Sequence, residues 1–108
     1  MALRPDILVH KQTFGPSDLL HITVPIGSKL LDIAEDIRYE GWFAVWYERP
    51  IYSPGELTIK LYVVPTGYPW DVTNTNTEYW KTIHTSNGLV WHIYKERENT
   101  DDGRKTTN

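Results

Sequence analysis

Apolar and polar side chains alternate along most of this chain, and this period of two constrains the fold more than any other feature. The alternation is clearest over residues 57–64, with one face formed by Leu57, Ile59, Leu61 and Val63 and the other by Thr58, Lys60 and Tyr62. Segments bounded by turn residues predict further strands over 7–13, 19–24, 42–48, 79–85 and 89–94. The pattern therefore predicts an all-β protein.

Residues 29–39 fit two structures. A helix would present one apolar stripe, formed by Leu30, Ile33, Ala34 and Ile37, with Ser28 as its N-cap. A strand would instead present one face, formed by Leu31, Ile33, Ile37 and Tyr39. Because the surrounding segments are all predicted strands, we expect a strand here, although the fold class leaves room for one short helix.

The chain has 108 residues, the size of a single domain. We predict one antiparallel domain over residues 1–95, a sandwich or partly closed barrel of about six or seven strands, followed by a disordered polar tail over 96–108. A domain this small buries a limited core, whereas aromatic rings are abundant, with five Trp, seven Tyr and two Phe. We therefore expect a homo-oligomer and assign part of the rings to core or subunit packing, namely Trp42, Phe43, Trp46, Trp80 and Trp91.

Charge and cysteine content exclude several function classes. Eleven Lys and Arg residues against fourteen Asp and Glu give a net charge of −3 without a basic stripe, so we expect no bulk binding to DNA. The absence of Cys excludes disulfides, cysteine-ligated zinc and thiol catalysis. No apolar run approaches the length of a membrane span and no apolar leader begins the chain, so we expect a cytosolic protein without membrane contact.

No catalytic motif is present. The serines lack a G-x-S-x-G elbow, and the glycines are scattered singly, without a phosphate-binding loop. We therefore predict a non-enzymatic protein that needs no cofactor and no metal.

The C-terminal hairpin carries a second candidate surface, whose outer side suits either solvent or a flat ligand. If Asn87 and Gly88 form a type I′ turn, His84 lies opposite Trp91 and His92 lies opposite Ile83, so these two histidines point to opposite faces and share no metal. A change of one residue in turn length would reverse this. The predicted core side holds Trp80, Thr82, His84, Leu89, Trp91 and Ile93, and the outer side holds Tyr79, Lys81, Ile83, Val90, His92 and Tyr94.

The loop after residue 64 is the best candidate for binding. Its glycine, Gly67, allows close backbone approach, while Tyr68 and Trp70 offer rings for stacking. Trp70 has an alternative role, in which it folds back and caps one end of the core. The complete predicted ligand site combines rings, hydroxyl and imidazole groups and isolated cations: Arg49, Lys60, Tyr62, Thr66, Gly67, Tyr68, Trp70, Lys81, His92 and Tyr94.

Five segments of the chain carry a resemblance: residues 24–31 (VPIGSKLL), 42–46 (WFAVW), 63–69 (VVPTGYP), Tyr79 and 90–94 (VWHIY). Over roughly residues 6–96 they resemble a family of small proteins, mainly from tailed bacteriophages and prophages, that is catalogued as a domain of unknown function. Phe43 and the longer Thr/Asn loop depart from the family pattern. The resemblance implies a compact, oligomeric all-β phage protein with a strand over 30–37, and gives no catalytic residues to transfer.

Two functions follow as hypotheses. The first is a phage accessory protein that, in the cytoplasm of the infected host, sequesters a small nucleotide-type signalling molecule of a bacterial anti-phage defence system. A planar, anionic, cyclic nucleotide-like ligand would need rings for stacking and a few fixed cations. The alternative is a protein-interaction module, either an inhibitor of a host enzyme or a small structural or replication-associated phage component. Convergence of Arg49, Lys60 and Lys81 beside Tyr68 or Trp70 would favour the ligand, and scattered cations would favour the module.

Overall fold

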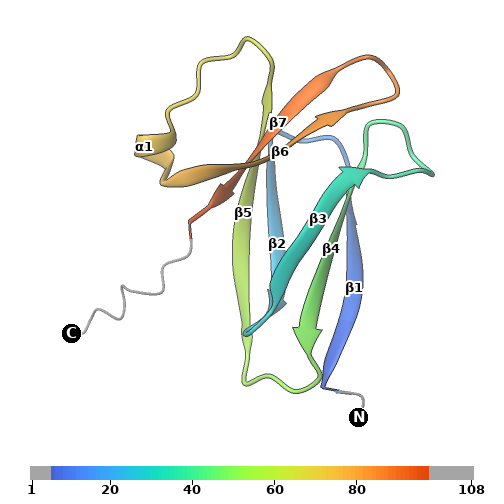
Figure 1. Ribbon diagram of the computed structural model, residues 1–108, viewed down its shortest axis with the longest axis vertical. Helices are drawn as coiled ribbons and strands as arrows, with labels where there is room; N and C mark the ends of the chain where they lie inside the picture. The colour runs from blue at the N-terminus through green and yellow to red at the C-terminus, as the bar shows by residue number, and fades with distance from the viewer. Residues whose placement is uncertain (1–5, 98–108) are drawn as a thin grey trace, which may run out of the picture.

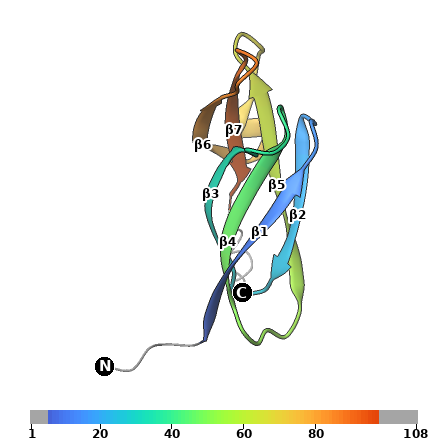
Figure 2. The same cartoon turned by 90° about the vertical axis from the view of Figure 1, so that its right-hand side faces the viewer.

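Two antiparallel sheets pack face to face in the computed structural model, which describes residues 6–97 (Figures 1 and 2). The strands within this range are β1 (Ile7–Phe14), β2 (Leu19–Pro25), β3 (Lys29–Glu35), β4 (Phe43–Pro50), β5 (Glu56–Pro65), β6 (Thr77–His84) and β7 (Val90–Glu96). The three-stranded sheet has the order β1-β4-β3, and the four-stranded sheet has the order β2-β5-β7-β6. The predicted all-β sandwich is confirmed, and the sheets do not close into a barrel.

The ambiguous segment forms a strand, as its β neighbours suggested. β3 covers residues 29–35 and pairs with β4. The helical turn α1 (Val72–Thr75), four residues long, lies in the loop between β5 and β6. β7 extends through Glu96, and the predicted tail beyond residue 97 lies outside the described residues.

The core lies between the two sheets. It is formed by the side chains that point inward from one face of each contributing strand. Its buried side chains are Leu20, Ile22, Val24, Ile33, Phe43, Val45, Tyr47, Leu61, Val63, Ile83 and Ile93. Trp80 and Trp91 pack against this cluster as predicted. Trp42 does not join it, because it lies in the turn before β4, where it is 38% exposed and contacts the Tyr39 ring.

The turn between β6 and β7 is not the predicted type I′ turn. That turn needs a positive φ at both of its central residues, but of the two only Gly88 has one, at 88°. The Thr85 amide donates to the Leu89 carbonyl at 2.9 Å, and the Leu89 amide donates to the Asn87 side-chain oxygen at 3.2 Å. Ser86, Asn87 and Gly88 thus form a three-residue loop that ends in a left-handed glycine, and Leu89, directly after the loop, is 49% exposed.

This longer turn shifts the register by one residue. Ile83 lies opposite Trp91, and Thr82 lies opposite His92. Opposed residues share a face, so Thr82 and His84 point outward with His92, whereas Ile83 points into the core. The predictions that Thr82 and His84 face the core, that Ile83 faces outward and that the two histidines face opposite ways are wrong.

A bulge at Trp80 changes the faces of β6 a second time. The register shifts between Tyr79 and Lys81, so Tyr79 lies opposite Tyr94 while Lys81 lies opposite buried Ile93. A bulge inserts one unpaired residue and thereby reverses the alternation beyond it. Tyr79 therefore stays on the outer face with Tyr94, and the prediction that Lys81 shares this face is wrong.

Candidate functional site

A row of large side chains crosses the outer face of the four-stranded sheet. The strand pairings align Leu19 of β2 with Tyr62 of β5, Tyr62 with Tyr94 of β7, and Tyr94 with Tyr79 of β6. The Tyr79 and Tyr94 rings meet edge to face with centroids 5.9 Å apart. We call the surface formed by Tyr62, Trp70, Tyr79 and Tyr94 the aromatic face.

Trp70 covers the middle of this row. The loop between β5 and β6 brings its ring over Tyr62 and Tyr94, with centroid distances of 5.0 and 5.6 Å. The ring thus packs on the outside of the sheet and does not cap the end of the core. Its indole Nε1 is buried and finds no hydrogen-bond partner within residues 6–97. An unpaired buried donor is costly, and a molecule bound on the outer face would reach this N–H only after the Trp70 ring had moved.

A chain of hydrogen bonds adjoins the rings. Thr66 Oγ1 lies 2.7 Å from Nε2 of His92, and Thr82 Oγ1 lies 3.0 Å from Nδ1 of the same ring. The Tyr79 hydroxyl bonds to Thr82 Oγ1 at 2.6 Å. Both ring nitrogens of His92 are therefore engaged, so an incoming molecule meets the imidazole ring rather than a free nitrogen.

The turn after β5 presents one more ring. Thr66 and Tyr68 donate their amides to the carbonyls of Val90 and Pro65. Gly67, between them, has a φ of 93° and open space where a Cβ would lie. Tyr68 follows with 69% of its surface exposed. The backbone of this turn is thus held by hydrogen bonds while the Tyr68 side chain remains accessible.

The three predicted cations do not converge on this surface. Lys60 lies on β5 two residues before Tyr62, on the same face, and its backbone amide donates to Glu96. Lys81 forms an ion pair with Asp32 of β3 instead. Arg49 lies in the other sheet, where its guanidinium donates to the carbonyls of Pro50 and Ile51 at 2.9 and 3.1 Å.

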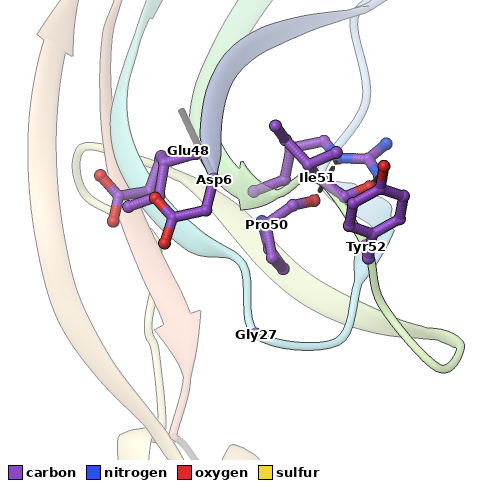
Figure 3. A pocket seen from close by; sticks show the side chains of 8 residues that line it. Asp6, Gly27, Glu48, Pro50, Ile51 and Tyr52 are labelled. Carbon is purple, nitrogen blue, oxygen red and sulfur yellow. Dashed lines mark hydrogen bonds between the residues drawn. The ribbon is translucent and has the colours of Figure 1, made fainter. Parts of the chain in front are cut away.

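Arg49 lines a separate open cavity of about 620 Å³ at the end of β4. Figure 3 shows the side chains of Asp6 and Glu48 at one side of it and Tyr52 at the other, with Pro50 between them. Since the Arg49 guanidinium is held by backbone carbonyls and two carboxylates flank the opening, this cavity is poorly suited to an anionic ligand.

The carboxyl groups with shifted pKa values, Asp36 and Glu35, form hydrogen bonds with loop residues and lie away from the aromatic face. Hydrogen bonds from the Arg38 guanidinium and amide lower the pKa of buried Asp36 to about 2. The Gly41 amide, followed by the Ser86 amide and hydroxyl, lowers the pKa of Glu35, whose carboxylate thereby links the end of β3 to the β6–β7 turn. Both carboxylates are therefore stabilised in their charged form as structural anchors.

Residues 6–97 contain neither a candidate metal site nor a candidate membrane-spanning helix. No group of three or more His, Cys, Asp or Glu residues in this range has the arrangement of a metal site. No helix in this range has the length and apolar character required to cross a membrane.

The structure thus brings eight of the ten predicted site residues to the aromatic face or its adjoining turn: Lys60, Tyr62, Thr66, Gly67, Tyr68, Trp70, His92 and Tyr94. Arg49 and Lys81 lie elsewhere. Sequence reasoning missed Thr82, which links His92 to Tyr79. The run Ser86-Asn87-Gly88 also fits a three-residue loop whose last residue is a left-handed glycine. That loop length would have predicted Thr82 on the outer face beside His92.

Fold and site together define a small two-sheet antiparallel β protein with a row of aromatic side chains on the outer face of one sheet. The chain belongs to the family described as Domain of unknown function (DUF7352), which it matches over residues 7–104. Comparisons with curated proteins and with solved structures found no match.

Proposed function

We propose that this chain is a non-enzymatic phage protein-interaction module whose aromatic face binds another protein in the cytoplasm of the infected host. The partner is a host enzyme that it inhibits, or a component of a phage structural or replication assembly. The phage setting rests on the motif resemblance given above. The observation that carries the proposal is the row of rings on a sheet face from which Arg49 and Lys81 are missing.

Rings of this kind suit protein interfaces. Tyr and Trp contribute large contact areas with few rotatable bonds, and they are enriched where proteins associate. Trp70 is held between Tyr62 and Tyr94, so little side-chain freedom is lost when a partner covers it. Lys60 supplies a charge at the rim, where charges steer association.

Affinity capture from host lysate tests this proposal. The tagged wild-type chain is compared with Tyr79→Ala, on the aromatic face, and with Tyr52→Ala, a matched control on the exposed β4–β5 loop. We expect a stoichiometric partner with the wild type and the control, and a loss of at least tenfold with Tyr79→Ala. Equal capture by all three proteins, or no stoichiometric partner, would overturn the proposal. Circular dichroism melts establish that both variants fold.

The unpaired indole N–H of Trp70 favours a second candidate, sequestration of a small nucleotide-type signalling molecule of a bacterial anti-phage defence system. Such a ligand would stack on the rings and place its charge near Lys60, and it would accept the hydrogen bond of the buried N–H once the Trp70 ring turned toward it. A thermal-shift screen with cyclic di- and trinucleotides and cyclic ADP-ribose isomers tests it. A ligand at about 100 times its Kd stabilises a fold by about 2.7 kcal/mol, or roughly 10 °C or more for a domain of this size. Trp70→Phe, which keeps a ring and removes the N–H, should reduce the shift.

A further inference from the structure

The free edge of β1 is the most exposed apolar strand edge within residues 6–97. Ile7, Leu8 and Val9 are 49%, 44% and 60% exposed. Successive residues of a strand point to opposite faces, so the first three residues of β1 expose apolar side chains on both faces of the strand. Figure 2 shows the reason: the N-terminal end of β1 extends past the end of β2 and keeps only β4 beside it.

The other three sheet edges carry features that block pairing. β3 has a bulge at Leu31, and its Ile33 amide donates to the Asp32 carboxylate. β6 has the bulge at Trp80. β2 ends at Pro25, and its Thr23 carbonyl accepts a hydrogen bond from the Gln12 side chain. Bulges, prolines and occupied backbone groups are the usual protection of edge strands.

β1 has none of these within residues 7–14. All eight of its residues pair with β4 without a register shift, so β1 contains no bulge. The exposed apolar segment at its start, Ile7 to Val9, is followed by His10 and then by the exposed cation Lys11. A regular, apolar edge of this kind is a template for another strand.

We propose that β1 is a homodimerisation strand that pairs antiparallel with β1 of a second copy, joining the two three-stranded sheets into one. A two-fold axis perpendicular to the sheet places residues of the same face opposite one another. With the axis at Leu8, Leu8 lies opposite its own copy and Ile7 lies opposite Val9 in both halves. An axis at Val9 would set Ile7 against Lys11 and Leu8 against His10. Apolar pairing therefore selects the axis at Leu8.

The second copy suits this edge better than an unrelated peptide because the apolar segment is complementary to itself in that register. The inference is independent of the proposed function, because the aromatic face lies on the other sheet. The dimer would leave that face open on both subunits.

Light scattering of the full chain after size exclusion, over a wide concentration range, tests the dimer. We expect the wild type to be dimeric and Leu8→Lys, which would bring two ammonium groups together at the axis, to be monomeric with an unchanged circular dichroism spectrum. Leu31→Lys, the same substitution at the bulged and similarly exposed β3 edge, is the matched control and should remain dimeric. A monomeric wild type, or a Leu8→Lys dimer, overturns the proposal.

Disulfide crosslinking gives a second readout that does not depend on a destabilising charge. The chain has no cysteine, so a single introduced thiol reports only on its own copy. Leu8→Cys should form a covalent dimer under mild oxidation, because the two positions are directly opposed. Val9→Cys should not, because its two Cα atoms would lie about 8 Å apart, beyond the reach of a disulfide. Faster crosslinking of Val9→Cys overturns the proposed register, and failure here leaves the capture experiment on the aromatic face unaffected.

Discussion

Truncation of Ile83 tests the hairpin register on which the composition of the aromatic face depends. In the structure Ile83 is 5% exposed and belongs to the core, whereas the next residue, His84, is exposed on the outer face. A type I′ turn would exchange these two positions. The two registers therefore predict opposite rankings for truncation of the same two residues.

The expected magnitudes follow from burial. Ile83→Ala removes three buried carbons, at about 0.8 kcal/mol each, and leaves a cavity that adds to the loss, so we expect about 3 kcal/mol. Ile83→Val removes one carbon and should cost about 1 kcal/mol. His84→Ala, at an exposed position, should change the free energy of unfolding by no more than about 0.5 kcal/mol.

Urea unfolding followed by tryptophan fluorescence measures all three variants. A loss of about 3 kcal/mol is a large share of the roughly 5–15 kcal/mol of a typical domain, and the milder Ile83→Val keeps the comparison possible if Ile83→Ala does not fold. The m-values should match the wild type, since only stability is altered. A cost for His84→Ala equal to or above that of Ile83→Val would refute the register and separate Thr82 from His92.

Three further predictions concern the loops and edges. Asp36 has a pKa lowered to about 2, so its contribution to stability is complete above its usual value near 3.8 and is lost as the pH falls towards 2; Asp36→Asn should flatten this part of a stability curve measured by urea unfolding. Gly88→Ala should cost about 1 kcal/mol because its φ is positive, and Gly88→Asn should cost less in the same assay. A double-mutant cycle on Lys81 and Asp32, both partly exposed, should give a coupling below about 1 kcal/mol, and a larger coupling would contradict a surface ion pair.

The strands could be predicted because their alternation is directly visible in the sequence. One buried face per strand produced the pattern over residues 57–64, and the structure buries Leu61 and Val63 of that face. The segment at 29–35 was harder, because Ile33 fits both a helical stripe and a strand face. The choice between helix and strand is decided only by the pairing of this segment with β4, which lies further along the chain.

The register could not be predicted from the same pattern. Ser86-Asn87-Gly88 satisfies a two-residue and a three-residue loop alike, and the choice depends on the φ of Asn87, which the residue type leaves open. In the structure the Asn87 side chain accepts the Leu89 amide, a local bond that favours the longer loop. One residue of turn length then decides which side chains reach the surface.

The bulge at Trp80 has the largest consequence for function. Tyr79 and Lys81 are two residues apart, and a regular strand would place both on the outer face. Trp80 separates them, so that Tyr79 joins Tyr94 while Lys81 reaches Asp32 of the other sheet. The aromatic face thereby loses one of the three predicted cations, Lys81, and keeps the Tyr79 ring, which a protein interface would use. The same bulge blocks the β6 edge and leaves β1 as the edge best suited to pairing. The single inserted residue, Trp80, therefore favours a protein as the partner of the aromatic face and also favours β1 as the dimer strand.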